Sequence, residues 1–216
     1  MRLLRYTLVS EGSTDANLIP IINWTLEEVG KVELVQGVRA EFWRLPEPPG
    51  ALTARIINAV DLFPCDALFV HRDADREPAK NRHDEIRAAV EVARQGSCRL
   101  PAVAVVPVRM LEAWLLFDEL AIRSAAGNPN GQSPLNLPPL TRVEDRPDPK
   151  RDLREALRTA SELSGRRLKK FNTSTAFWRV VDFIRDFSPL RQLPAFRQFE
   201  KSVAIMSANE WRPDFY

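Results

Sequence analysis

The sequence predicts an α/β fold, in which an open, mostly parallel sheet is flanked by helices and followed by a C-terminal helical extension. Three observations predict it. Short β-rich runs alternate with segments of helical spacing up to residue 125, which is the pattern of strand–helix–strand units in parallel sheets. Residues 127–148 are rich in Pro, Asn and Gly, and only helical segments follow them. We therefore expect a domain at 1–125 and a basic helical extension at 149–207, joined by a loop.

Strands are predicted where β-branched or apolar runs end in a turn signal. Gly37 interrupts the second run, which therefore forms either one strand or two. Ala102–Val108 is the most β-branched stretch of the chain and should be a central strand. In chain order the predicted strands are Leu3–Ser10, Glu33–Gln36 with or without Glu41–Leu45, Ala67–His71 and Ala102–Val108.

Helices are predicted where apolar residues recur at three- and four-residue spacing. A hydroxyl of Ser13 or Thr14 can cap the first helix, because it can accept a hydrogen bond from a free N–H of the first turn. The aromatic residues of the last three helices fall at helical spacing and should form a core stripe. In chain order the predicted helices are Asn17–Val29, Ala51–Leu62, Asn81–Arg94, Leu111–Ile122, Pro149–Leu163, Thr173–Phe187 and Leu193–Ser207.

The charge of the chain is unevenly distributed. The 216 residues carry a net charge of +2. Residues 1–141 contain 15 Lys and Arg against 18 Asp and Glu, whereas residues 142–201 contain 15 against 9. An acidic part could hold a metal ion and a basic part could follow a phosphate backbone. The alternative is that the basic residues only solvate the surfaces of helices.

Composition excludes several classes of protein. An apolar content of 44% is that of an ordinary globular chain. No apolar run is long enough to span a bilayer, and the short N-terminal apolar run meets Glu11 too early for a secretory signal. Cys65 and Cys98 lie far apart and outside any metal-type spacing. We expect a cytoplasmic protein in which both are reduced, buried thiols.

Acidic residues follow three of the predicted strands. Glu11 and Asp15 follow the first, Asp73 and Asp75 follow Ala67–His71, and Glu112 follows the most β-branched run. Ligands of open α/β sheets bind outside the carboxyl ends of the strands, so these acids can converge there. Clustered carboxylates repel one another unless a cation holds them. The pattern therefore predicts a site for a hard divalent cation, Mg²⁺ or Mn²⁺.

These motifs resemble those of the TOPRIM family, the magnesium-binding module of topoisomerases, primases and OLD-type nucleases. Glu11-Gly12 is similar to the Glu-Gly pair after the first strand of that family, and Asp73-Ala74-Asp75 is similar to its Asp-x-Asp motif. EGSTD, with Asp15, resembles the OLD-type branch. LEAWLL, with Glu112, resembles an E-x-W motif of small stand-alone TOPRIM-like proteins.

The later segments RPDPKRDL and RRLKKFN resemble Pro-Lys and Lys motifs of the same small group, which points to Lys150 and Lys170. Members of that group are often encoded beside an ATPase in phage-defence loci. The resemblance therefore implies a TOPRIM-like fold and a Mg²⁺-dependent nuclease with a partner ATPase. Its substrate would be nucleic acid, DNA more than RNA, although no residue pattern separates the two.

The hydrolytic members of the family are the best match by elimination. A topoisomerase needs a nucleophilic tyrosine, but Tyr6 lies in the predicted first strand and Tyr216 is the last residue. A zinc-bearing primase needs more than two scattered cysteines. On a two-metal template, the metal ligands are Glu11, Asp15 and Asp73 for one ion, and Asp75 and Glu112 for the other. The catalytic set is Glu11, Asp73, Lys150 and Lys170, in which a lysine neutralises the phosphate.

Two other functions remain open. Asp-x-Asp after an apolar strand also occurs in haloacid-dehalogenase-like phosphatases, but there it lies near the N-terminus and Glu11 would have no role. A TOPRIM-like scaffold or regulatory subunit of an ATPase complex would keep the acids without catalysis. The chain has no phosphate-binding loop motif, so any ATP dependence requires another protein. His71 is more readily explained as a neutral, packed histidine than as a general base.

Overall fold

The computed structural model describes residues 3–96 and 99–210. The predictions for Cys98 and Tyr216 therefore concern residues outside the described ones. The chain divides into two compact units, Met1–Val106 with Arg197–Tyr216, and Pro107–Phe196. The division falls before the motif LEAWLL rather than after it, and most of the last helix belongs to the first unit.

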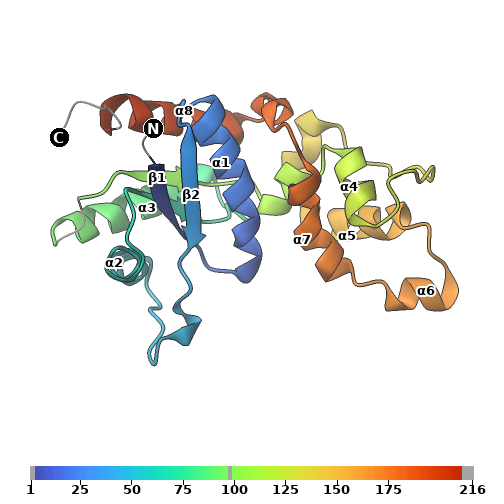
Figure 1. The fold of residues 1–216 in the computed structure, drawn as a ribbon, viewed down its shortest axis with the longest axis horizontal. Helices are drawn as coiled ribbons and strands as arrows, with labels where there is room; N and C mark the ends of the chain where they lie inside the picture. Colours follow the sequence, from blue (N-terminus) through green and yellow to red (C-terminus); the bar gives the residue numbers. More distant parts are fainter. Residues whose placement is uncertain (1–2, 97–98, 211–216) are drawn as a thin grey trace. The chain divides into compact units, whose positions relative to one another are not determined.

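The first unit contains an open, all-parallel sheet, as the sequence predicts. Its strands are β1 (Leu3–Val9), β2 (Leu34–Arg39), β3 (Ala67–His71) and β4 (Ala102–Val105). The order across the sheet is β2-β1-β3-β4, and each neighbouring pair is parallel. The chain therefore leaves β1 toward one neighbour, returns across it to β3, and continues outward to β4. Figure 1 shows the paired strands β1 and β2.

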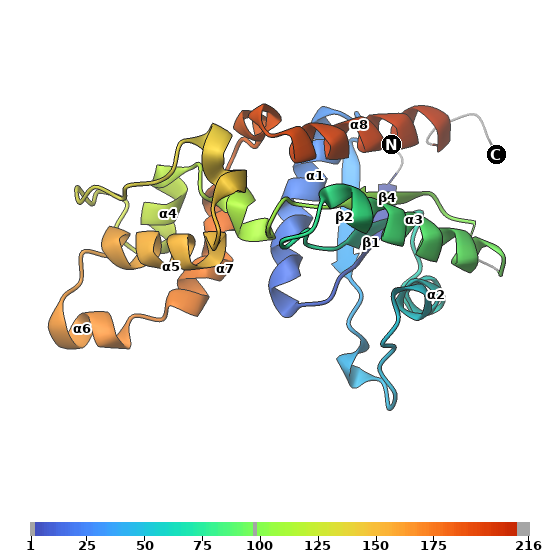
Figure 2. The same cartoon turned by 180° about the vertical axis from the view of Figure 1, so that it is seen from behind.

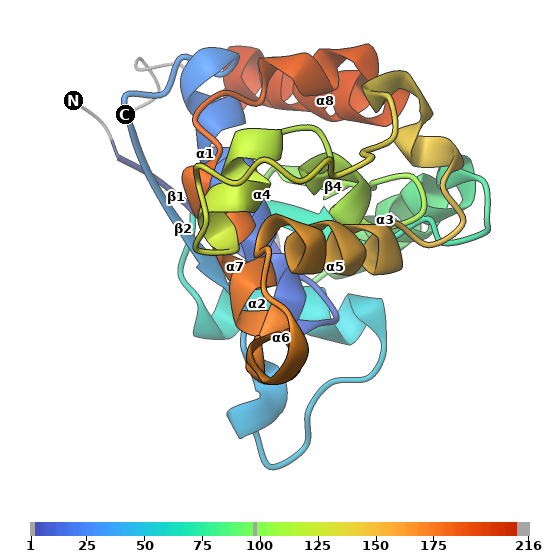
Figure 3. The ribbon, with the colours of Figure 1, turned by 90° about the vertical axis from the view of Figure 1, so that its right-hand side faces the viewer.

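Helices cover both faces of this sheet. They are α1 (Leu18–Glu28), α2 (Leu52–Leu62), α3 (Ala79–Arg94) and α8 (Pro194–Glu210). α1 and α8 lie on one face and α2 and α3 on the other, as Figures 2 and 3 show. Right-handed crossovers require this arrangement, because the chain moves from β1 to β2 in one direction and from β2 to β4 in the other.

Side chains of the two central strands alternate between these faces. Leu68 and Val70 belong to the apolar core under α2 and α3. Phe69, between them, lies with its ring centroid 6.3 Å from that of Phe199 of α8. β3 is buried along its whole length, as expected of a strand covered by helices on both faces.

β4 is an edge strand, and the prediction that it is central was wrong. It ends at Val105, and Pro107 shortly after it lacks the backbone N–H that would continue the ladder. Burial of both faces explains the apolar composition of β4. Val103 and Val105 are buried, whereas Ala102 and Ala104 pack against the core that contains α3. Cover on both faces therefore gives an edge strand the composition of a central one.

Gly37 does not break the second strand, because β2 runs through it. A Cβ atom at this position would lie 2.2 Å from Cζ of Tyr6 on the neighbouring strand. Glycine is needed here because the tyrosine ring packs directly over the backbone. The segment predicted as a further strand at Glu41–Leu45 instead contains a 3₁₀ turn at Phe42–Arg44.

The second unit is helical. Its helices are α4 (Glu119–Ala125), α5 (Pro149–Ala160), α6 (Gly165–Lys170) and α7 (Thr173–Phe183). α4, α5 and α7 pack against one another. Short 3₁₀ segments lie at Leu111–Leu115, Leu140–Asp145 and Ser188–Gln192. The core includes Trp114, whose ring contacts Phe196 edge-on at 5.2 Å.

Three details of this unit differ from the prediction. The expected helix at Leu111–Ile122 is divided, because Asp118 starts a new helix by accepting a hydrogen bond from the N–H of Ala121. α6 was not predicted, since none of its residues is buried and it has no apolar face. α7 ends at Phe183, four residues early. In the part of the chain that the structure describes, no helix is both long and apolar enough to cross a membrane.

Candidate active site

The candidate site lies where the strand order reverses. β1 has β2 on one side and β3 on the other, so the loops after β1 and β3 leave the sheet toward opposite faces. Such a switch point opens a crevice at the carboxyl ends of the strands. The loop after β1 carries Glu11 and Asp15, and the loop after β3 carries Asp73 and Asp75. The expected convergence at this edge therefore involves two neighbouring strands of the first unit.

Asp15 is held by the turn that follows β1. Its Oδ2 accepts a hydrogen bond of 2.8 Å from the N–H of Gly12, and a 3₁₀ turn at Ser13–Asn17 leads into α1. The aspartate is only 8% exposed. Asp15 thus performs at this turn the capping role that the sequence assigned to a hydroxyl of Ser13 or Thr14.

His71 joins the two acidic loops. It is the last residue of β3 and is 2% exposed. Its Nδ1 lies 3.0 Å from the carbonyl oxygen of Val105, and because a carbonyl only accepts, Nδ1 carries the proton. Nε2 lies 3.5 Å from Oδ1 of Asp73 and 3.9 Å from Oδ1 of Asp15. His71 is packed, as the sequence analysis favoured, but it also faces both acids.

This orientation has an electrostatic consequence. A neutral imidazole with its proton on Nδ1 presents a lone pair at Nε2. Two carboxylate oxygens near that lone pair are favourable only when a positive charge lies among them, either a second proton on the ring or a cation. A histidine whose Nδ1–H is fixed by a backbone carbonyl also has the usual orientation of a metal-binding histidine. The arrangement therefore favours a positive charge at this point.

Glu11 lies beside this centre and is bound by an arginine. Its carboxylate forms a short ion pair with Arg72, and Arg72 also lies 3.2 Å from Glu85 of α3. The guanidinium is largely buried between the two acids. Sequence analysis did not single out Arg72, although its position directly before Asp73 could have marked it.

Asp75 is directed differently from Asp73. β3 ends at His71, so the strand does not continue through Asp73 and Asp75. Asp75 has a φ of 54°, a left-handed conformation that aspartate tolerates better than most residues. Its carboxylate lies 3.6 Å from Arg82 of α3. Arg82 also binds Glu85 and the carbonyl of Asp73, and its hydrogen bond to Glu85 is the main cause that raises its pKa.

A metal ion fits part of this cluster. Among the described residues, no three His, Cys, Asp or Glu side chains are arranged as a ready metal cage. Mg²⁺ often needs no such cage, since it keeps several waters and binds through one or two carboxylates together with substrate phosphates. Asp15 and Asp73 are such a pair, because both face the same nitrogen of His71. The residues present therefore fit one hydrated cation better than two.

The remaining predicted site residues belong to the second unit. Glu112 is 5% exposed, and its Oε1 lies 3.8 Å from Nζ of Lys150 in the first turn of α5. The structure thus joins two residues that separate sequence motifs had indicated. Lys170 is the exposed last residue of α6 and forms no ion pair with another described residue.

Two other sequence inferences can be compared with the structure. Tyr6 is fully buried, its hydroxyl donates to Asn23 at 2.8 Å, and burial raises its pKa. It is unsuited to act as a nucleophile, as the sequence analysis concluded. Cys65 is a free thiol but is only half-buried, so the prediction of a buried thiol was wrong there.

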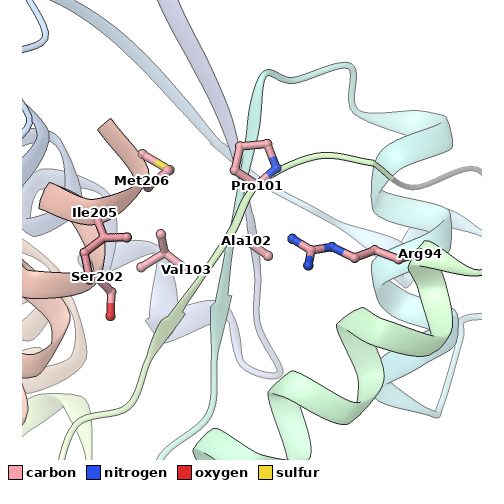
Figure 4. A pocket seen from close by; sticks show the side chains of 7 residues that line it. All are labelled: Arg94, Pro101, Ala102, Val103, Ser202, Ile205 and Met206. Atoms are coloured by element: carbon pink, nitrogen blue, oxygen red, sulfur yellow. The ribbon is translucent and has the colours of Figure 1, made fainter. Parts of the chain in front are cut away.

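Two of the cavities that described residues line belong to the first unit. One, of about 440 Å³, is lined by residues that follow β1 and β2, including Glu11, Arg39 and Arg55. The other, of about 240 Å³, lies where β4 begins, between Arg94 of α3 and Ile205 of α8 (Figure 4). The second cavity has no acidic lining residue and opens at the amino end of the sheet. Only the first adjoins the candidate site.

Comparisons with known proteins add no assignment. No protein-family model matches the chain, and neither a search of curated proteins nor a search of solved structures found a match.

Proposed function

We propose that this protein is a divalent-metal-dependent phosphodiesterase that hydrolyses nucleic acid. The supporting observation is the position of Asp15 and Asp73. They come from different loops at the switch point of a parallel sheet and both face Nε2 of the buried His71. This is where an open α/β sheet binds its ligand, and two carboxylates are the donors that a hydrated Mg²⁺ or Mn²⁺ uses.

Each residue of the cluster has a role in this proposal. Asp15 and Asp73 would bind the cation, and His71, whose ring is fixed by the carbonyl of Val105, directs the lone pair of Nε2 toward the same position. A bound cation would lower the pKa of a water and stabilise charge on the phosphate oxygens. Glu11 lies at the exposed rim, where it can accept a proton from the attacking water. Arg72 holds Glu11 in place and supplies positive charge beside the phosphate.

Nucleic acid is the proposed substrate because of the basic helices in the second unit. α5 and α6 expose seven arginines and lysines to solvent: Arg151, Arg154, Arg158, Arg166, Arg167, Lys169 and Lys170. Such a surface binds phosphate backbones without reading sequence. DNA is the first substrate to test, with RNA as the second, and the proposed compartment is the cytoplasm. The resemblance to phage-defence proteins adds a partner ATPase to the proposal.

The experiment measures cation binding and cleavage separately. Calorimetry with Mn²⁺ should show binding to the full chain that is lost in Asp73→Asn and Asp15→Asn. Cleavage of single-stranded DNA, plasmid DNA and RNA should require Mg²⁺ or Mn²⁺ and be lost in the same variants. The matched control is Asp61→Asn, which removes an exposed carboxylate of α2. Cleavage by Asp73→Asn at the wild-type rate would refute the proposal, and cleavage of para-nitrophenyl phosphate but not of nucleic acid would indicate a phosphatase.

A second function is favoured by the ion pairs. Glu11, Asp75 and Glu112 each face an arginine or lysine in the structure, so three of the five predicted metal ligands already have a cationic partner. This is the state expected of a scaffold or regulatory subunit whose acids have structural roles. That function predicts no Mn²⁺ binding and no cleavage by the isolated chain or by the chain with a partner ATPase.

A further inference from the structure

The 440 Å³ cavity beside the acidic cluster combines positive charge with an aromatic wall. Its lining residues follow β1 and β2 within the first unit, and Glu11 of the acidic cluster is one of them. Its volume is within the range of sites that bind small molecules. Its lining includes Ser10, Ser13, Arg39, Trp43 and Arg55.

Arg55 is a cation without a carboxylate partner among the described residues. Its Nε donates to the carbonyl of Pro49 at 3.0 Å and its Nη1 to the carbonyl of Ser10 at 3.4 Å. These contacts fix the guanidinium at the wall of the cavity and leave other N–H groups to donate. Arg39 differs from Arg55, because Oε1 of Glu41 lies 2.8 Å from Nη2 of Arg39 and partly neutralises its charge. The cavity therefore favours an anion at Arg55.

Two serine residues also line the cavity. Ser10 is 5% exposed, and its Oγ has no hydrogen-bond partner among the described residues. A buried hydroxyl without a partner is unusual, since such groups are nearly always satisfied by protein, water or ligand. Ser13 is exposed, and its side chain does not cap the turn that it begins. Both hydroxyls can donate to an oxygen anion, as in many phosphate sites.

Two aromatic residues, Phe42 and Trp43, also line the cavity. Trp43 is 67% exposed, and its Nε1 donates to Glu41 at 3.2 Å. The hydrogen bond restrains the exposed indole, while Phe42 beside it is buried in the core. An exposed, restrained indole can stack on a nucleobase of any sequence. An inorganic anion has no ring and would not stack on the indole.

We propose that this cavity binds one nucleotide unit of a single strand, with the phosphate at Arg55 and the base on Trp43. A base can reach the indole only when it is not paired, which favours a single strand over a duplex. The placement next to the cleavage site rests on the function proposed above. The binding itself requires neither the metal nor the acids, so the two proposals can fail independently.

The test measures binding to the full chain in EDTA, where metal-dependent cleavage does not occur. The probes are thymidine, thymidine monophosphate, the dinucleotide pTpT and an eight-residue oligo(dT). Calorimetry at 50 mM salt should show that thymidine monophosphate binds at least about tenfold more tightly than thymidine. Oligo(dT) should bind at least as tightly as the mononucleotide.

The variants assign the contacts. Arg55→Gln should weaken pTpT binding about tenfold or more and remove the difference between thymidine monophosphate and thymidine, since it removes the proposed phosphate contact. Trp43→Ala should weaken the binding of pTpT and of thymidine monophosphate about 5- to 100-fold, the range expected from loss of base stacking, and Trp43→Phe should restore most of the binding. The control Arg99→Gln removes an exposed arginine of the same unit outside the cavity and should change binding less than twofold.

Three results would overturn this inference. The first is wild-type affinity for pTpT in both Arg55→Gln and Trp43→Ala. The second is equal affinity for thymidine monophosphate and thymidine in the wild-type chain. The third is tighter binding of the mononucleotide than of oligo(dT), which would exclude a strand as the occupant. Loss of cleavage in Asp73→Asn with unchanged pTpT binding in EDTA would leave both proposals standing, whereas metal-independent cleavage would refute only the first.

Discussion

Replacing Asp73 by asparagine should remove most of the cation binding at the candidate site. The carboxylate faces the same imidazole nitrogen as Asp15, at 3.5 Å. A unit charge about 4 Å from a carboxylate interacts with it by about 4 kcal/mol near a protein surface. The side chain is about one-third exposed, so solvent screening reduces this value, to about half. A loss of about 2 kcal/mol corresponds to a roughly 30-fold weaker affinity for a cation.

Thermal unfolding detects this loss without any assay of catalysis. A cation at 100 times its dissociation constant stabilises the folded chain by about 2.7 kcal/mol, which raises Tm by roughly 5–10 °C for a chain of this length. In Asp73→Asn the same cation concentration lies only about threefold above the weakened dissociation constant. The stabilisation should then fall to about 0.8 kcal/mol, and the shift in Tm to roughly 2–3 °C.

The control and the sign of the effect without metal make the test specific. Asp61→Asn removes an exposed carboxylate of α2 and should keep the full shift in Tm. Without a divalent cation, Asp73→Asn should be at least as stable as the wild type, since one of several neighbouring negative charges is gone. An equal rise in Tm with Mn²⁺ in the wild type and in Asp73→Asn would refute the reasoning, because the cation would then bind elsewhere.

Three further predictions concern stability. Gly37→Ala should lower the free energy of unfolding by about 1–3 kcal/mol in urea titrations, because the new Cβ overlaps the ring of Tyr6. Lys150→Met should lower it by about 1–3 kcal/mol, because it leaves the carboxylate of Glu112 buried beside an apolar side chain. Backbone hydrogen bonds from the loop before α5 lower the pKa of Glu162 to about 2. The stability that this carboxylate contributes is complete above its unfolded pKa, about 4.3, and is lost as the pH falls toward 2, so Glu162→Gln should show a smaller loss of stability between pH 6 and pH 3 than the wild type.

The sequence predicts best those elements whose own pattern determines them. The bounds of β3 agree with the prediction, because a short apolar run between polar turns can pack in only one way in a covered sheet. The bounds of α3 differ by two residues at one end, since its amphipathic spacing is long and regular. Both elements border the candidate site, and the Asp73 loop lies between them.

The errors occur where a distant residue decides the local structure. A glycine such as Gly37 indicates a break when the sequence is considered alone. Only the ring of Tyr6 on the neighbouring strand explains why this strand needs glycine there. Whether β4 is a central or an edge strand depends on whether a further strand pairs with it. The residues of β4 do not encode that. Composition reports that both faces of a strand are buried, but it does not report whether both edges are paired.

The candidate site shows the same division between what is local and what is not. Spacing along the chain led to the expectation that acids collect at the carboxyl edge, since every parallel strand ends there. Asp15 and Asp73 face the same nitrogen of His71, whereas Glu112 belongs to the second unit.

Spacing could not reveal that His71 would be aimed by the carbonyl of Val105, because that contact joins residues 34 positions apart. Nor could it reveal that Arg39 and Arg55 would line one cavity with Trp43.

The pairing of charges decides how many cations the cluster can need. Five carboxylates meet here, those of Glu11, Asp15, Asp73, Asp75 and Glu85, and two guanidinium groups, of Arg72 and Arg82, lie among them. Both guanidinium groups contact Glu85, and between them they also bind the two most exposed acids, Glu11 and Asp75. The two acids nearest His71 are thus the pair around which positive charge is most needed. One divalent cation would leave this cluster of five negative and two positive side chains close to neutral, and two would do the same, so net charge alone does not decide the number of ions. A second ion would need Glu11 or Asp75 as a ligand, and arginines already bind both. The ion pairs therefore fit one cation better than the two-ion template that the sequence predicts.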